Sequence, residues 1–168
     1  LLRNSQTMLL QRQLTEASYK VDVVVLGKED KFSCEMKTQM QILRNQGVSC
    51  FHKIPDKDYD CFVDAIFGVG LTREITDTEI LDAIDTINSS DAYTYSVDIP
   101  SGIHTDTGCV MGRAVKADET ITFTCEKVGL CLYPGKEYAG RICTKNIGIG
   151  NSDIEKVGVT HYGYKEKD

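Results

Sequence analysis

A short apolar run that ends in a glycine turn, DCFVDAIFGVGLTRE at residues 60–74, constrains the fold of this chain more than any other stretch. Its first half has the composition of a strand that is buried on both faces. Gly68 and Gly70 follow, and a helix is predicted next; a strand, a glycine turn and a helix start can cradle an anionic ligand on free backbone N–H groups. Asp64 interrupts the apolar run, and an unpaired buried carboxylate is expensive. Asp64 is therefore either functional or part of a structural hydrogen bond.

Strand-like and helix-like patterns alternate through the first hundred residues. Strands are predicted at 20–27, 48–54, 60–67 and 92–100, and helices at 5–18, 32–43 and 77–88. Residues 76–79 match a capping box, with Thr76 as the N-cap. Residues 119–125 and 140–150 are further strands divided by turns, and the polar segment 151–168 is a tail. This order predicts an α/β fold with a mostly parallel central sheet and helices on both faces.

Size and charge exclude several classes of protein. The chain has 168 residues, which fits one domain over 1–168. Its net charge of −6 and pI of about 5.1 argue against nucleic acid as a partner, because phosphate binding needs a basic face. We expect no membrane partner, since no run of 18 apolar residues occurs. The seven cysteines form no CxxC pair and are predicted to be reduced core thiols of a cytoplasmic protein.

A second acidic position closes the strand predicted at 92–100. Asp98 precedes a tight turn with Ser101, so it is either an acid/base group or an aspartate that caps its own turn. Asp64 and Ser101 end neighbouring segments and both offer oxygen ligands, but two ligands alone do not argue for a metal. Ser101 lies in no GxSxG elbow and has no well-placed histidine. Lys116 and Lys127 flank the strand at 119–125 and either contact phosphate or lie on the surface.

Taken together, these segments resemble a known family. Three sequence motifs match, and they occur in the order of the family within a region from about Leu14 to Gly150. The motifs are DCFVDAIFGVGLTREI, SVDIPSGIHTDTG and GRAVKADETITFTCEKVGLCLYPGKEYAGRICTKNIGIG. They resemble the NAD(P)H-hydrate epimerase family, also called the YjeF N-terminal domain. That family interconverts the R and S epimers of hydrated NADH or NADPH in nicotinamide nucleotide repair. The resemblance implies a Rossmann-like three-layer α/β/α sandwich and an isomerase.

The resemblance also implies specific site residues, a cofactor and partners. Asp98 matches the family's substrate-binding aspartate at the reacting centre and is our hypothesis for the catalytic acid/base. Asp64 and Ser101 match the ligands of a potassium ion. We expect a homodimer that acts on hydrated NADH or NADPH and is paired functionally with an ADP- or ATP-dependent NAD(P)H-hydrate dehydratase. The predicted substrate-binding loop consists of Gly68, Val69, Gly70, Leu71, Thr72, Arg73 and Glu74.

One segment departs from the family pattern. The family carries a loop near GNNGGDG before the helix that corresponds to residues 8–17, and this chain has LLRNSQTM there. If the site has decayed, the alternative is a catalytically inactive scaffold for dimerisation and interaction, or a module that binds a nucleotide without changing it. The presence of Asp64, Arg73, Asp98 and Ser101 favours the enzyme, because a scaffold has little use for such a set.

Overall fold

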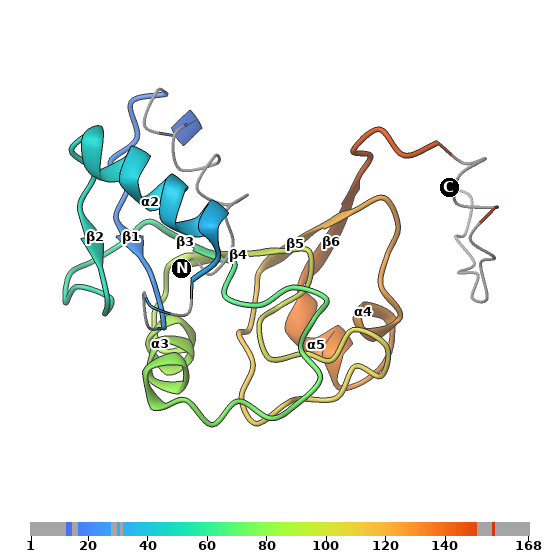
Figure 1. Cartoon of the computed structure of the whole chain (residues 1–168). Helices are drawn as coiled ribbons and strands as arrows, with labels where there is room; N and C mark the ends of the chain where they lie inside the picture. The colour runs from blue at the N-terminus through green and yellow to red at the C-terminus, as the bar shows by residue number, and fades with distance from the viewer. Residues whose placement is uncertain (1–12, 15–16, 28–29, 31, 151–155, 157–168) are drawn as a thin grey trace.

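The computed structural model describes residues 13–14, 17–27, 30, 32–150 and 156, and its strands form two parallel sheets (Figure 1). The first sheet pairs β1 (Val23–Val24) with β2 (Cys50–Phe51). The second has the order β3-β4-β5-β6, with β3 (Cys61–Asp64), β4 (Tyr93–Val97), β5 (Glu119–Phe123) and β6 (Arg141–Lys145). Neighbouring strands in both sheets are parallel, which confirms the predicted α/β class.

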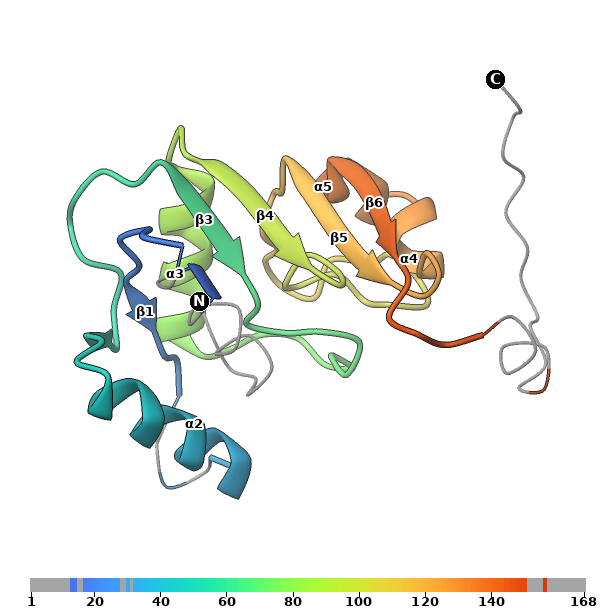
Figure 2. The same cartoon turned by 90° about the horizontal axis from the view of Figure 1, so that it is seen from above.

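Helices lie on both sides of the sheets. They are α2 (Cys34–Asn45), α3 (Thr78–Asn88), α4 (Val128–Cys131) and α5 (Gly135–Ala139). In Figure 1, α2 lies above the strands, whereas α3, α4 and α5 lie below them. The view from above in Figure 2 shows the four strands of the larger sheet side by side, with α3 and α5 behind them. The carboxyl ends of these strands therefore share one edge of the sheet.

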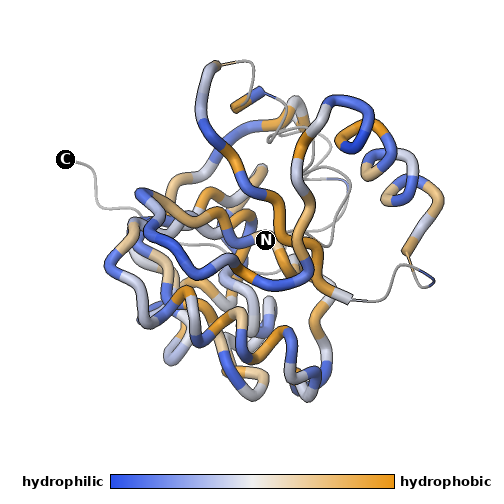
Figure 3. Tube along the Cα trace, turned by 90° about the vertical axis from the view of Figure 1, so that its left-hand side faces the viewer, coloured by the Kyte–Doolittle hydropathy of each residue, from blue (hydrophilic) through white to orange (hydrophobic). Residues whose placement is uncertain are grey.

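The apolar stripes predicted for α2 and α3 form two core layers. Met36, Met40 and Leu43 of α2 are buried against one side of β1. The isoleucines of α3 pack with Phe62 of β3 and with Val24 on the other side of β1. Figure 3 shows the same pattern, because hydropathy alternates along the helices. The spacing of apolar residues thus decided which face each helix buries.

The start of α3 differs from the prediction. The helix begins at Thr78, and its N-cap is Asp77, whose carboxylate accepts a hydrogen bond from the N–H of Glu79 at 3.1 Å. Thr76 is therefore not the N-cap, and the predicted capping box is wrong. An aspartate in this position carries a full negative charge at the positive end of the helix dipole, which favours it over the neutral threonine one residue earlier.

The segments between β5 and β6 also differ from the prediction, which placed only turns there. The helices α4 and α5 have four and five residues, too short to show a periodic pattern. The position of these helices depends on a close approach between their backbone and other backbone segments. A Cβ on Gly129 would lie 2.3 Å from the carbonyl oxygen of His104. A Cβ on Gly135 would lie 2.2 Å from the carbonyl oxygen of Gly129. Tertiary contacts rather than local pattern therefore set these helices.

The cysteines are free, as predicted, but most are not core residues. Cys34, Cys61, Cys109, Cys125 and Cys131 are exposed, and the other two are half-buried. Among the exposed cysteines only Cys61 lies in a strand, where the period of two turns it outward while Phe62 is buried.

Parts of the earlier predictions lie outside the described residues. The tail 151–168 is one of them, apart from residue 156, and most of the helix predicted at 5–18 is another. The prediction of one domain over 1–168 stays a prediction. No helix in the part of the chain that the structure describes is long and apolar enough to span a membrane.

Candidate functional site

The carboxyl ends of β3 and β4 bring two predicted site residues into direct contact. Asp64, the last residue of β3, pairs in register with Ser96 of β4. The chain then passes Asp98 and makes a tight turn at 100–103, which the Ile103 N–H closes by donating to the Pro100 carbonyl at 3.0 Å. This turn returns Ser101 to Asp64, so that the serine Oγ donates to Asp64 Oδ1 at 2.6 Å.

Glycine is required inside this turn. Gly102 has φ +98°, and a Cβ there would lie 1.9 Å from the carbonyl oxygen of Arg113. The N–H of Met111 donates to the Gly102 carbonyl at 2.7 Å, and the N–H of Val115 donates to the Ser101 carbonyl at 2.8 Å. The returning loop therefore fixes the position of Ser101 from both sides.

Four hydrogen-bond donors converge on the Asp64 carboxylate, which is fully buried. Oδ1 accepts from Ser101 Oγ at 2.6 Å and from the Ile66 N–H at 3.3 Å. Oδ2 accepts from Ser96 Oγ and from the Ser101 N–H, both at 2.8 Å. Burial raises the pKa of the Asp64 carboxyl, and the hydrogen bonds from Ser101 and Ser96 oppose that rise. The structure thus confirms that Asp64 takes part in structural hydrogen bonds.

The same cluster contains oxygen atoms that could hold a cation. They are the Asp64 carboxylate, the Ser101 hydroxyl and the Phe67 carbonyl, which lies 3.4 Å from Ser101 Oγ. Among the described residues, no lysine or arginine forms an ion pair with Asp64, so its buried carboxyl group has no cationic side chain against it. No three His, Cys, Asp or Glu side chains gather as metal ligands in the described ranges. Oxygen ligands of this kind suit a hard cation rather than a soft transition metal.

Asp98 lies just beyond β4 with a strained backbone. Its φ is +72°, a left-handed value that non-glycine residues rarely adopt. Oδ1 accepts from Thr122 Oγ1 at 3.2 Å and lies 2.5 Å from Lys127 Nζ. The side chain is only partly buried, with 19% of its surface exposed. One oxygen is thus held by the protein, while Oδ2 has no hydrogen bond among the described residues.

The predicted substrate-binding loop surrounds this edge but does not lead directly into a helix. Gly68, Val69 and Gly70 are exposed, as are Thr72, Arg73 and Glu74, whereas Leu71 is buried and anchors the loop in the α3 core layer. The predicted order of strand, glycine loop and helix is present, but α3 begins only at Thr78, so Gly68 and Gly70 do not lie at its N-terminus. The glycines have another property: a Cβ on Gly68 or Gly70 would meet nothing within 4 Å.

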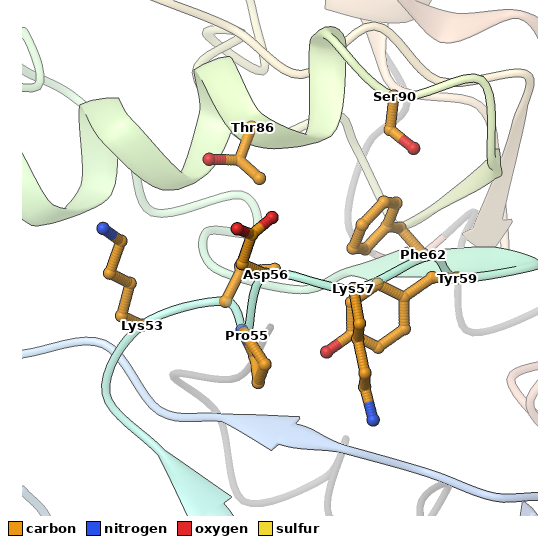
Figure 4. Close-up of a pocket in the computed structure, with 9 residues that line it drawn as sticks. Lys53, Pro55, Asp56, Lys57, Tyr59, Phe62, Thr86 and Ser90 are labelled. Carbon is orange, nitrogen blue, oxygen red and sulfur yellow. The ribbon is translucent and has the colours of Figure 1, made fainter.

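Two surface hollows lie away from these residues. One, of about 320 Å³, lies between the segment 53–59 and the end of α3 (Figure 4). The other, of about 510 Å³, is lined by Asn88, Lys116, Glu137 and Tyr138. Neither hollow is lined by Asp64, Asp98 or Ser101. The residues that line the larger hollow precede β4, β5 and β6, so this hollow lies at the end of the sheet where these strands begin.

Sequence reasoning missed three residues that contact the site. Ser96 and Thr122 are fully buried hydroxyls that donate to Asp64 and Asp98. Lys127 was read as a phosphate ligand or a surface residue, yet its side chain is only 15% exposed and contacts Asp98. Alternation does not reveal the two hydroxyls, because Ser96 shares its face of β4 with Thr94 and Thr122 shares its face of β5 with Thr120, while the apolar residues of both strands lie on the other face. No local signal identifies Lys127.

A model of the family described as "YjeF-related protein N-terminus" matches residues 4–129, three quarters of the chain. The chain belongs to this family. It is 40% identical over 139 residues to a protein of Oenococcus oeni named "NAD(P)H-hydrate epimerase", which covers 82% of this chain and 66% of that protein. A protein of the same name from Levilactobacillus brevis is 54% identical over 91 residues, 54% of this chain and 42% of that protein. The chain therefore spans at most about two thirds of these relatives.

A longer relative and a solved structure complete the comparison. The "Bifunctional NAD(P)H-hydrate repair enzyme Nnr" of Thermofilum pendens is 32% identical over 155 residues, 86% of this chain and 29% of that protein. The crystal structure of the yeast protein YNL200c superposes with a TM-score of 0.67 at 19% identity, over 96% of this chain and 69% of that chain. At that identity the yeast structure supports the Rossmann-like α/β fold alone.

Proposed function

We propose that this chain is an NAD(P)H-hydrate epimerase, an isomerase that interconverts the R and S epimers of hydrated NADH or NADPH. Relatives that bear this name match most of the chain. The single observation that supports the proposal most is the carboxylate of Asp98: it lies at the carboxyl edge of a parallel sheet, with one oxygen fixed by the protein and the other open. That edge is where ligands of such sheets bind.

The reaction needs a group that moves one proton. The hydroxyl of the hydrate is on a carbon beside the ring nitrogen, so the nitrogen lone pair can expel it as an iminium forms. Asp98 would protonate the departing oxygen through Oδ2, the oxygen that does not face Lys127, and the hydroxyl would leave as water. The resulting carboxylate would then accept a proton from the water that adds to either face of the iminium, which restores the acid and gives both epimers.

The loop Gly68–Glu74 would bind the dinucleotide. Two of its positions are glycine although no neighbouring atom excludes a side chain there. Neither Gly68 nor Gly70 has a positive φ, so backbone conformation does not demand glycine either. The remaining reason for glycine at these two positions is a ligand that lies directly on the backbone. We therefore expect Gly70→Ala to weaken substrate binding without lowering the melting temperature, with Gly47→Ala, at a position of φ +74°, as a contrast that lowers stability alone.

A potassium ion would bind at Asp64 and Ser101, whose carboxyl and hydroxyl oxygens suit a hard cation. When bound, such a cation supplies a fixed positive charge that positions the substrate or its loop. Because Ser101 Oγ now donates to Asp64 Oδ1, this hydroxyl must turn before both oxygens can face one ion. Asp64 and Ser101 would then hold the ion while the Ser101 N–H keeps its bond to Asp64 Oδ2.

Further parts of the proposal concern the protein's setting. The product would pass to an ADP- or ATP-dependent NAD(P)H-hydrate dehydratase, and the Nnr relative, whose printed name is bifunctional, supports such a pairing. We propose a homodimer, by analogy with the family. A cytoplasmic location is proposed as well, since the described cysteines are all free thiols, which suits a reducing compartment.

The test is the rate at which a purified epimer of hydrated NADH equilibrates, followed by chromatography, with and without potassium. We expect acceleration over the uncatalysed rate, a further increase with potassium, and a loss of roughly 10²- to 10⁴-fold in Asp98→Asn. Asp91→Asn, at an exposed position before β4, is the matched control and keeps full activity. Asp98→Asn with the wild-type rate would remove the catalytic role, and a wild-type protein without acceleration would point to the inactive scaffold.

A further inference from the structure

Two adjacent strands of the sheet end in the same strained turn. Beyond β4, Asp98 has φ +72°, and the N–H of Ile99 donates to the Val97 carbonyl at 3.0 Å. Beyond β5, Thr124 has φ +68°, and the N–H of Cys125 donates to the Phe123 carbonyl at 2.8 Å. A positive φ with a hydrogen bond from residue i+2 to residue i is the pattern of a rare, strained γ-turn. Such strain persists only where surrounding contacts impose it, and it is concentrated at functional sites.

Lys127 connects these two turns. Its Nζ donates to the carbonyls of Phe123 at 2.9 Å and Cys125 at 3.4 Å, which flank the turn at Thr124. The same Nζ lies 2.5 Å from Asp98 Oδ1, and only 15% of the lysine side chain is exposed. An ammonium group has three N–H donors, and these three acceptors use all of them. Lys127 therefore has no donor left for a phosphate, in contrast to one reading of its position in the sequence.

The contacts of Asp98 are divided unequally between its two oxygens. Oδ1 faces Lys127 and Thr122 Oγ1, and the Phe123 N–H lies 3.5 Å from it. Oδ2 has no hydrogen bond in the described ranges. Two backbone carbonyls hold the Lys127 ammonium in place, and the ammonium in turn holds Asp98 Oδ1. Oδ2 is therefore the oxygen that is left to contact a ligand.

We propose that Lys127 is a positioning residue, which acts on the reaction only through the Asp98 carboxylate. This inference rests on the proposed function, because it assigns a supporting residue to the same acid/base group. The ion pair holds Asp98 in its strained turn and keeps Oδ2 directed at the substrate. Removal of the ammonium releases the carboxylate, so the proton transfer loses its geometry while the substrate-binding loop is untouched.

The experiment is a double-mutant cycle on epimer equilibration, with kcat and KM measured for each protein. Lys127→Met approximately keeps the length of the side chain and removes the charge. The control is Lys116→Met, at an exposed lysine that precedes β5, whereas Lys127 follows it. We expect Lys127→Met to lower kcat roughly 10- to 100-fold with KM changed less than about twofold. In Asp98→Asn, the same change at Lys127 is expected to lower kcat no further. Lys116→Met keeps wild-type kcat.

Two results would overturn the inference: a wild-type kcat in Lys127→Met, or a full additional loss when the change is made in Asp98→Asn. Independent losses would mean that Lys127 acts by another route, such as general stability. If Lys127→Met does not fold, Lys127→Gln replaces it in the cycle, since its amide still donates to the two carbonyls without a charge.

A crystal structure of the Lys127 variant separates this inference from the proposed function. If the wild-type protein does not accelerate epimerisation, the proposed function fails, and the variant structure alone decides the positioning role. The expected structure has Asp98 moved away from Thr122 Oγ1 and its φ outside the left-handed region. An Asp98 side chain that keeps its position and φ without the ammonium group would refute the inference.

Discussion

Replacement of Asp64 by asparagine tests the central cluster, because the change preserves shape and alters only the hydrogen bonds and the charge. Oδ1 accepts from the Ile66 N–H and Oδ2 from the Ser101 N–H. Neither backbone group can turn. Whichever way the amide of Asp64→Asn is oriented, its NH₂ group therefore faces a backbone N–H, and one donor loses its acceptor.

The magnitude follows from that orphaned donor. An unsatisfied buried N–H costs about 1–3 kcal/mol. The amide should place its NH₂ toward Ile66, whose contact of 3.3 Å is the weaker of the two, and the hydroxyl of Ser101 can turn to accept. An opposing contribution exists, because burial raises the pKa of Asp64 and the neutral amide avoids the cost of a buried charge. We expect a net loss of about 2 kcal/mol near neutral pH, which lowers the melting temperature by about 4–8 °C.

The assay is denaturant unfolding in buffer free of potassium and sodium, so that cation binding does not contribute to stability. Ser96→Ala is the graded control: it removes one hydroxyl donor to Oδ2 and leaves the Ser101 N–H in place, with an expected loss of about 1 kcal/mol. Asp91→Asn at an exposed position should change stability by less than about 0.5 kcal/mol. An Asp64→Asn protein as stable as the wild type would refute the reasoning, since the cost of the buried charge would then match its four hydrogen bonds.

Three further outcomes are expected. Gly102→Ala should prevent stable folding, because its Cβ would overlap a backbone carbonyl at 1.9 Å, whereas Gly68→Ala should keep the wild-type melting temperature; circular dichroism compares the two. The pKa of Asp22 is lowered, mainly by its hydrogen bond with Lys57. The contribution of Asp22 to stability is therefore present above the ordinary pKa of 3.8 and is lost as the pH falls through the lower pKa of the folded protein. In an acid titration followed by circular dichroism, Asp22→Asn should lack that part of the stability loss. Desolvation raises the pKa of Cys61, so alkylation near neutral pH, followed by mass spectrometry, should label Cys61 more slowly in the folded protein than in the unfolded chain. Equal labelling rates would contradict that expectation.

Local pattern was sufficient for the long elements and insufficient for the short ones. The apolar stripes of α2 and α3 have a helical period that is visible in the sequence, and the structure buries those faces. The helices α4 and α5 have too few residues for any period, and contacts of Gly129 and Gly135 with distant carbonyls determine them. At the start of α3, Thr76 and Asp77 can both cap a helix, and the aspartate is the N-cap because the helix dipole favours its negative charge.

The sequence by itself determined the parallel α/β arrangement and placed Asp64, Asp98 and Ser101 near one edge of the sheet, because residues at the carboxyl ends of parallel strands must meet there. Only the tertiary structure decided what each of them contacts. Ser101 reaches Asp64 through a turn held by backbone hydrogen bonds from Met111 and Val115, and Lys127 reaches Asp98 from beyond the next strand. Such contacts depend on the positions of residues far apart along the chain, which neither composition nor period encodes. The full burial of Asp64 and the partial exposure of Asp98 follow from that packing.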